Sequence, residues 1–174
     1  MANYCIRCGS PLKTRREDDR ERKFCPNCGW VYYPKPNQAS AVAILENGKV
    51  LMVRRKHEPF KGQWTMPSGF MEFGETPEET ALREMQEELG VEVELTGLVD
   101  TLMEWDDPRG LCLLVVYTGR IKPGPDGRSP TPRAGDDASE VRAFPLDQLP
   151  QESAFQAHRT ALEKLRSRTL NPPS

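Results

Sequence analysis

The sequence predicts an α/β fold preceded by a small cysteine-rich module. Short β-prone apolar runs are interspersed with two stretches that have the length and pattern of helices. Near the N-terminus, two Cys-x2-Cys pairs lie in a polar segment with few apolar residues. Pro34-Lys35-Pro36 then favours an extended linker. We expect the module at residues 1–34, the linker at 35–37, the main domain at 38–168 and a tail at 169–174.

The cysteine pairs predict a structural zinc site. Their spacing, C-x2-C-x16-C-x2-C, is typical of zinc ribbons, and the expected ligands are Cys5, Cys8, Cys25 and Cys28. Four thiolates close the tetrahedral shell of zinc, so we expect this ion to stabilise the fold and not to catalyse. The alternative is two disulfides or a redox pair. Because no signal peptide precedes the pairs, a reduced, cytoplasmic compartment is the default.

Basic and acidic residues interleave between the two cysteine pairs, in the run KTRREDDRERK from Lys13 to Lys23. Such a mixture favours a solvated hairpin over a phosphate-binding stripe, because mixed charge releases few counterions. The formal net charge of the chain, −2, points the same way. Nucleic acid is therefore not favoured as a partner. No apolar run approaches the ~20 residues of a membrane helix, so no membrane association is expected.

The main domain is expected to open with a hairpin. Ala39–Leu45 and Val50–Arg54 read as strands, and Glu46-Asn47-Gly48-Lys49 between them is a turn sequence. Lys56–Phe73 is rich in glycine and proline and is expected to be a loop.

The run from Thr76 to Gly90 predicts a helix with both ends capped. Thr76 can act as N-cap, Pro77 suits the first helical position, and Glu79 completes a capping box. Gly90 stands where a C-cap is expected. At roughly 100° per residue, the apolar side chains that share a face are Leu82, Met85 and Leu89. Another face carries carboxylates three and four residues apart, at Glu84, Glu87 and Glu88.

These clustered carboxylates point to a metal site. Like charges at such spacings weaken a helix by about 0.2–0.5 kcal/mol per pair. They become favourable when they hold a hard divalent cation, and Mg²⁺ and Mn²⁺ prefer oxygen ligands. The alternative explanation is a solvated acidic face without a metal.

Further extended segments and one more helix follow. We expect two extended stretches, a turn, a buried strand that contains Cys112, a long loop and an amphipathic helix. In order, these segments are Val91–Leu95, Leu98–Trp105, Asp106–Gly110, Leu111–Gly119, Lys122–Asp136 and Ser153–Arg168.

The acidic helix belongs to a longer motif. The run from Gly69 to Val91 fills every fixed position of G-x5-E-x7-R-E-U-x-E-E-x-G-U, where U is aliphatic. The chain thus resembles the Nudix hydrolases, and the cysteine module resembles the zinc ribbon of NADH pyrophosphatases and of some hydrolases of ADP-ribose or flavin dinucleotides. The resemblance implies an α/β/α sandwich with a mixed sheet. It also implies Mg²⁺- or Mn²⁺-dependent hydrolysis of a nucleoside diphosphate linked to another group.

The resemblance also implies roles for particular residues. Glu84 and Glu88 would be the principal metal ligands, with Glu87 beside them and the backbone carbonyl of Gly69 completing the set. Glu75 and Arg83 would position these ligands. Val141–Pro150 resembles the strand and turn that close the family's sheet, and relatives supply a further acidic ligand shortly before that strand. Here the candidate is Asp137, with Glu140 as the alternative, although acidic residues also simply solvate loops.

The substrate is less well defined by the sequence. NADH pyrophosphatases carry SQPWPFPxS soon after the motif, whereas this chain has LVDTLMEWDDP, which weighs against a dedicated NADH enzyme. ADP-ribose, FAD or a related dinucleotide is the leading expectation. A hydrolase of NAD-capped RNA and a non-catalytic nucleotide sensor are the alternatives. Candidate substrate-binding residues are Arg54, Arg55, Arg109 and Trp105, while His57 and His158 receive no role. A homodimer is expected from zinc-ribbon relatives.

Overall fold

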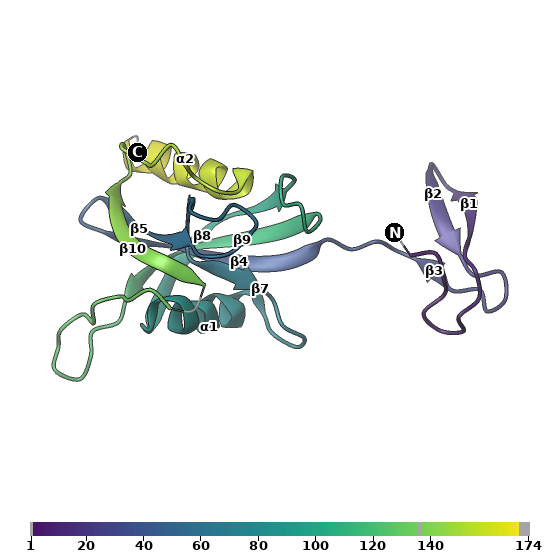
Figure 1. Cartoon of the computed structure of the whole chain (residues 1–174), viewed down its shortest axis with the longest axis horizontal. Helices are drawn as coiled ribbons and strands as arrows, with labels where there is room; N and C mark the ends of the chain where they lie inside the picture. The colour runs from purple at the N-terminus through teal and green to yellow at the C-terminus, as the bar shows by residue number, and fades with distance from the viewer. Residues whose placement is uncertain (1, 136, 171–174) are drawn as a thin grey trace. The chain divides into compact units, whose positions relative to one another are not determined.

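The computed structural model describes residues 2–135 and 137–170. The chain forms two compact units, Met1–Lys35 and Pro36–Ser174, which Figure 1 draws in purple and in blue to yellow. Among the described residues, neither helix has the length and apolar character of a bilayer-spanning segment.

The first unit contains a three-stranded antiparallel sheet in the order β1-β2-β3. Its strands are β1 (Lys13–Glu17), β2 (Arg20–Phe24) and β3 (Val31–Tyr32). Two tight turns flank the hairpin, and in each a glycine N–H donates to the carbonyl of the cysteine four positions earlier. The Gly9 and Gly29 bonds to Cys5 and Cys25 are each 2.9 Å long. Both glycines have positive φ, 70° and 74°, a region that other residues rarely adopt.

The second unit is built on a mixed sheet. Its main strand order is β10-β5-β4-β9-β8, with β6 paired to β5 and β7 to β4. The β4–β9 pair is parallel, and the other pairs are antiparallel. The strands are β4 (Asn37–Glu46), β5 (Lys49–Arg55), β6 (Trp64–Thr65), β7 (Ser68–Phe70), β8 (Val93–Glu104), β9 (Cys112–Ile121) and β10 (Ala138–Pro145).

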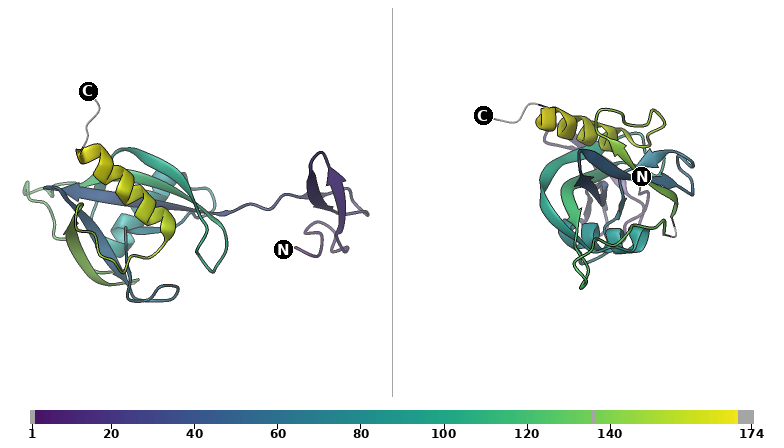
Figure 2. Two further views of the ribbon diagram at one scale, coloured as in Figure 1. Left: turned by 90° about the horizontal axis from the view of Figure 1, so that it is seen from above. Right: turned by 90° about the vertical axis from the view of Figure 1, so that its left-hand side faces the viewer.

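The two helices cover opposite faces of this sheet, as Figures 1 and 2 show. A hydrophobic core lies on each face of the sheet. Side chains of the central strand β4 pack alternately into one core and the other, because successive side chains of a strand point to opposite faces. Ala41 and Ala43 pack in the core that includes residues of α2 (Gln156–Leu170). Val42 and Ile44 pack in the core that includes residues of α1 (Pro77–Leu89). The predicted α/β/α sandwich with a mixed sheet is confirmed.

Helix α1 begins and ends at the expected residues. The Thr76 hydroxyl accepts from the Glu79 N–H at 3.2 Å, and the Glu79 carboxylate accepts from the Thr76 N–H at 2.8 Å. Gly90 ends the helix with φ 65°. The expected core face was wrong in one respect, since Leu82 is 41% exposed. The buried face is rotated toward Ala81 and Glu84, so the sheet side of α1 carries carboxylate as well as apolar side chains.

Several boundaries differ from the sequence prediction. The predicted loop Lys56–Phe73 contains the short strands β6 and β7. The two extended segments predicted between residues 91 and 105 are one strand, β8, with register shifts at Leu95/Gly97 and Leu98/Asp100. Helix α2 starts at Gln156 and runs to Leu170, so it includes the first residues of the predicted tail. The rest of that tail, and Asp136 at the end of the predicted loop, lie outside the described residues.

Candidate active site and metal centres

A cleft of about 390 Å³ opens in the second unit where several elements meet. Its acidic side chains include those of α1 and of the residue before β10, and its basic side chains include those at the end of β5 and in the β8–β9 turn. The start of α2 supplies an aromatic ring and a histidine. The lining residues used below are Arg55, Gly69, Phe70, Glu84, Glu87, Glu88, Glu104, Asp107, Arg109, Asp137, Phe155 and His158.

Arg83 organises the acidic side of the cleft. Its Nε and Nη2 donate to the two oxygens of Glu75 at 2.6 and 3.0 Å. Its Nη1 donates to Glu84 at 2.6 Å and to Glu87 at 2.9 Å. Nη2 also donates to the Phe70 carbonyl at 2.9 Å. Every nitrogen of the guanidinium therefore fixes either a carboxylate or the β7 backbone.

Glu75 anchors Arg83 and does not line the cleft. Besides the guanidinium, it accepts from the Glu72 N–H at 2.9 Å and from the Thr80 hydroxyl at 2.8 Å. The Arg83 guanidinium, followed by the Glu72 N–H, lowers the pKa of Glu75 to about 2. Glu75 is therefore a positioning residue: it stays ionised and holds Arg83 against the carboxylates that do face the cleft.

The remaining carboxylates repel one another in a partly buried setting. Burial, together with the charges of Glu84 and Asp137, raises the pKa of Glu88 to about 8, although its carboxylate accepts from the Ser68 N–H at 3.0 Å. Burial also raises the pKa of Glu84, which is 9% exposed, despite its bond to Arg83. A hard divalent cation would neutralise such a set of oxygen ligands, so the donor chemistry fits Mg²⁺ or Mn²⁺.

The long loop brings Asp137 to this cluster. The N–H of Gly135 donates to the Glu88 carbonyl at 2.8 Å, and the N–H of Arg133 donates to the Leu89 carbonyl at 3.0 Å. These bonds satisfy carbonyls at the end of α1 that have no partner within the helix. A Cβ at Gly135 would lie 2.2 Å from the Glu87 carbonyl oxygen, so only glycine permits this approach. Asp137 follows two residues later and lines the cleft.

Glu140, the alternative to Asp137, is occupied elsewhere. It forms ion pairs with Arg54, at 3.9 Å, and with Arg142. It does not line the cleft. Of the two candidates for the additional ligand, the geometry favours Asp137.

Gly69 lies directly against Glu84. A Cβ at this position would lie 1.9 Å from Glu84 Oε1 and 2.0 Å from its carboxyl carbon. Glu84 cannot move aside without losing its bond to Arg83. We therefore expect Gly69→Ala to leave the protein folded but to lower hydrolysis about 10–100-fold, with a higher metal requirement, as for other groups that position metal ligands.

The matched control is Gly97→Ala on β8. There the nearest atom to a new Cβ, Thr118 Oγ1, is at 3.4 Å, an ordinary contact. Metal-dependent rates of the two variants are compared with those of the wild type. Unchanged activity of Gly69→Ala would show that Glu84 does not need this close approach.

Two arginines of the cleft, Arg55 and Arg109, are held in place by hydrogen bonds and by contacts with aromatic rings. Arg109 Nη2 donates to the buried Asp107 at 2.8 Å, and its guanidinium lies 4.7 Å from the Phe70 ring centroid and 5.9 Å from that of Phe155. Arg55 lies 5.0 Å from the Phe155 ring and donates through Nε to the Pro59 carbonyl at 2.6 Å. Burial, and then repulsion from Arg109, lowers the pKa of Arg55. The arrangement suits an anionic ligand.

Sequence reasoning missed three cleft residues near the start of α2. Phe155 has φ 60°, which is strained for a residue with a side chain, and its ring contacts His158 at 5.3 Å. Buried His158 shares a 2.8 Å hydrogen bond through Nδ1 with Thr65, and burial lowers its pKa to about 3, so the ring is neutral. Buried Glu104 accepts from the Ala157 N–H at 2.9 Å. A phenylalanine, a lone histidine and a strand glutamate carry no motif that marks them.

Two predicted substrate-binding residues are not brought to the cleft. Arg54 precedes Arg55 on β5, so its side chain points to the other face, where it pairs with Glu140 and donates to the Gly62 carbonyl at 2.7 Å. Trp105 is 72% exposed and is not part of the cleft lining. Of the original candidates, Arg55 and Arg109 are the ones that line the cleft.

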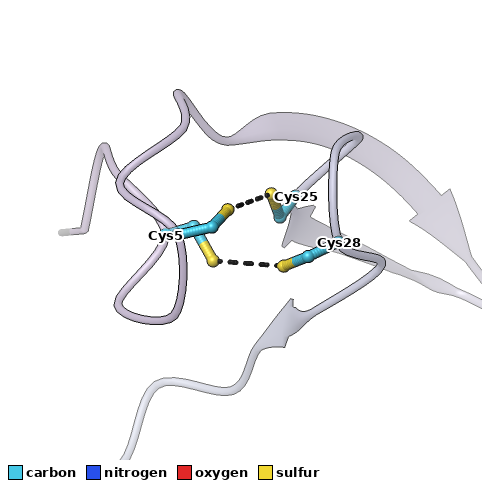
Figure 3. A group of neighbouring side chains, drawn as sticks. Cys5, Cys25 and Cys28 are labelled. Atoms are coloured by element: carbon cyan, nitrogen blue, oxygen red, sulfur yellow. Dashed lines mark hydrogen bonds between the residues drawn. The ribbon is translucent and has the colours of Figure 1, made fainter.

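The four cysteines of the first unit converge as zinc ligands do, and Figure 3 labels Cys5, Cys25 and Cys28 among them. Their sulfur atoms all lie within 4.8 Å of one another. Cys5 and Cys28 sulfurs are 3.6 Å apart, and those of Cys8 and Cys25 are 3.5 Å apart. Both distances are far longer than a disulfide bond of about 2.05 Å. They are close to the roughly 3.8 Å that a tetrahedral Zn–S distance of about 2.3 Å implies.

Comparison with known proteins identifies the family. The model of the NUDIX domain matches residues 35–165, and that of the Nudix N-terminal zinc ribbon matches residues 3–34. The chain belongs to the Nudix hydrolase family. Enzymes of this family use divalent metals, and the four ribbon cysteines form a cluster that could hold a metal ion.

Proteins similar to this Nudix hydrolase include one named for ADP-ribose and one named for NAD-capped RNA. The chain is 37% identical to an ADP-ribose pyrophosphatase of Methanocaldococcus jannaschii, over 68% of each protein. It is 30% identical to the NAD-capped RNA hydrolase NudC of Chromobacterium violaceum, over 94% of this chain and 59% of that protein. The chain thus spans about three fifths of the NudC relative.

Solved structures show the same fold. A NUDIX hydrolase from Nitrosomonas europaea superposes with a TM-score of 0.78 at 26% identity, covering 99% of this chain and 96% of that one. The NUDIX domain of Shewanella oneidensis NrtR, solved with ADP ribose, gives a TM-score of 0.62 at 26% identity, covering 79% and 90%.

Proposed function

We propose that this Nudix hydrolase cleaves the pyrophosphate bond of ADP-ribose or a related dinucleotide such as FAD, using Mg²⁺ or Mn²⁺. The observation that carries the proposal is one cleft lined both by a cluster of carboxylates and by two positioned arginines, Arg55 and Arg109. In this cleft, one part of an anionic substrate can bind to a metal ion held by the carboxylates while another part of the same substrate binds to the arginines. Relatives named ADP-ribose pyrophosphatase, and a neighbour solved with ADP ribose, support the choice of substrate.

In the proposed reaction, water attacks one phosphorus and the bond to the bridging oxygen breaks, which yields a nucleoside monophosphate and a second phosphate ester. A divalent cation held in this cleft would supply Lewis-acid charge for the reaction. Glu84, Glu88 and Asp137, with Glu87 and the Gly69 carbonyl nearby, would hold this cation. Arg83 keeps Glu84 and Glu87 in place through its two Nη1 hydrogen bonds, and Glu75 keeps Arg83 in place.

Arg55 is proposed to bind a substrate phosphate. Its Nε donates to Pro59, which leaves the outer edge of the guanidinium for an anion. We expect Arg55→Gln to raise KM about tenfold or more, with a smaller effect on kcat, because one charge-assisted hydrogen bond contributes about 1.5–3 kcal/mol. Arg109 is a poorer first target, since its removal takes the ion-pair partner from the buried Asp107.

Arg54→Gln is the matched control for Arg55→Gln. It removes the same charge from the adjacent residue, whose side chain pairs with Glu140 outside the cleft. Steady-state kinetics on ADP-ribose should show a raised KM for Arg55→Gln alone. Equal KM values for the two variants would argue against phosphate binding by Arg55.

Hydrolysis of NAD-capped RNA is a second candidate. It is favoured by the NudC relative, whose match extends over 94% of this chain. The absence of SQPWPFPxS from the sequence, which has LVDTLMEWDDP instead, makes it the second choice.

A substrate panel distinguishes the candidates. ADP-ribose, FAD, NADH, NAD, diadenosine polyphosphates, nucleoside triphosphates and NAD-capped RNA are incubated with Mg²⁺ or Mn²⁺, and products are separated by chromatography. Formation of AMP and a second phosphate ester from ADP-ribose or FAD supports the leading proposal. Turnover of capped RNA alone supports the second candidate, and tight binding without any turnover indicates a sensor.

The proposal includes a reducing compartment and a homodimer. No disulfide joins the described cysteines, which is the state that a reducing compartment maintains. The homodimer follows from zinc-ribbon relatives, and light scattering on the eluting protein would give the mass to compare with 19.7 kDa per chain.

A further inference from the structure

The hairpin of the zinc ribbon separates onto two faces the charges that interleave in its sequence. Successive residues of a strand point to opposite faces, and directly paired residues of antiparallel strands point to the same face. The register pairs Arg15 with Arg22, whereas the adjacent Arg16 pairs with Glu21. Charge mixing along the chain therefore does not produce a mixed surface.

One face of the hairpin, called the basic face below, is strongly positive. By register, its charged side chains are Lys13, Arg15, Glu17, Arg20 and Arg22. With four basic groups and one carboxylate, its formal charge is +3. The opposite face holds Arg16, Glu21 and Lys23, and Lys23 is already engaged, because its Nζ donates to the Ala2 carbonyl at 2.8 Å.

Aromatic rings lie among the cations of the basic face. Arg15 lies 4.7 Å from the centroid of Phe24, and Arg22 lies 4.8 Å from that of Tyr33. Tyr33 follows β3 and is 55% exposed. Across the described part of the chain, Arg15 pairs with Glu17 at 3.2 Å, and Lys13, Arg20 and Arg22 form no ion pair. The positive charge of this face is thus largely uncompensated.

This arrangement has an energetic cost that an anionic partner would remove. Like charges directly opposite one another on neighbouring strands are destabilising, and Arg15 and Arg22 form such a pair. Phosphates between the two guanidinium groups would convert repulsion into paired contacts. An exposed ring beside such cations adds a surface on which any base can stack.

We propose that the basic face of the zinc ribbon binds single-stranded nucleic acid, with Arg15 and Arg22 on backbone phosphates and Tyr33 stacked on a base. A lipid surface would use the charges but not the stacking ring, and a duplex keeps its bases stacked internally. The proposal is independent of the hydrolytic site. The sequence predicted that nucleic acid is not a partner, because the net charge is −2 and because basic and acidic residues interleave between the cysteine pairs. The proposal reverses that expectation.

The test measures binding of the full-length, zinc-loaded protein to a labelled single strand of about 15 nucleotides with a 5′-hydroxyl end. Fluorescence anisotropy is recorded over a series of salt concentrations. Parallel arms use RNA, DNA of the same sequence, an RNA duplex and phosphatidylserine vesicles. The RNA and DNA arms show which strand is preferred, and binding of either supports the proposal.

Adjacent residues provide a matched pair of variants. Arg15→Gln removes one charge from the basic face, and Arg16→Gln removes one from the other. We expect Arg15→Gln and Arg22→Gln each to weaken binding and to lower the slope of log K against log salt by about 0.7, while Arg16→Gln leaves both unchanged. Tyr33→Ala should weaken binding about fivefold or more. Zinc content and dinucleotide hydrolysis, measured for each variant, should match the wild type.

Several results would overturn the proposal. These are no binding of either single strand at low salt, equal losses in Arg15→Gln and Arg16→Gln, no effect of Tyr33→Ala, or binding of the duplex or the vesicles as tight as that of the single strand.

Discussion

Glu88→Gln is expected to lower hydrolysis by about 10²–10⁴-fold while leaving the protein folded. Glu88 lies in the acidic side of the cleft with Glu84 and Asp137, and burial and their charges raise its pKa to about 8. The substitution keeps the shape of the side chain and its ability to accept from the Ser68 N–H. It removes the negative charge that a divalent cation requires. Steady-state rates and the thermal unfolding midpoint are measured for the wild type and the variant.

Glu163→Gln is the control for this substitution, because Glu163 is an exposed glutamate of α2 that does not line the cleft. Glu87→Gln gives an intermediate test, since the Glu87 side chain is 58% exposed and forms an ion pair with Arg83. The expected order of activity loss is Glu88→Gln, then Glu87→Gln, then no loss for Glu163→Gln. Retention of most activity by Glu88→Gln would refute its assignment as a metal ligand.

Removal of zinc is expected to unfold the first unit and to leave the second unit folded. The ribbon has a three-stranded sheet and one cluster of four cysteines, whereas the second unit has its own cores on both faces of its sheet. Structural zinc contributes roughly 10–16 kcal/mol of apparent binding free energy at pH 7 in small zinc modules. Chelation, or Cys25→Ser, should therefore make residues before Pro36 sensitive to protease.

Cys112→Ala is the matched control, because Cys112 is buried in β9 and belongs to the second unit. This variant should keep one zinc ion per chain, as the wild type should. Zinc is measured by atomic emission, and proteolysis is followed by mass spectrometry. Protease resistance of the ribbon after complete chelation would contradict a structural role for zinc.

The sequence was most informative where local chemistry decides the structure. The capping box, the first-turn proline and Gly90 define α1 within the chain itself, and the structure has both caps. Similarly, Asn47-Gly48 gives the β4–β5 turn without help from distant residues. The choice between adjacent arginines was different. Arg54 and Arg55 look alike in sequence, and only the pairing of β5 with its neighbours decides that Arg55 lines the cleft.

Features that depend on distant segments were missed. Strands β6 and β7 have two and three residues, too few to show an alternating pattern. The buried face of α1 was misjudged because Glu84 takes a position where an apolar residue would be expected, while Leu82 is exposed. His158 and Phe155 come to the cleft because α2 packs on the sheet. The separation of the charged side chains onto two faces of the ribbon hairpin likewise appears only once the register of β1 and β2 is known.

The most direct test of the proposed function is hydrolysis of ADP-ribose in ¹⁸O-labelled water with Mg²⁺ or Mn²⁺, with products analysed by mass spectrometry. We predict AMP and ribose 5-phosphate, with the label on the phosphate of one of them, and no product with chelator or with Glu88→Gln. Label on neither phosphate, or product formation that is unaffected by chelator and by Glu88→Gln, would contradict metal-dependent attack of water on the pyrophosphate.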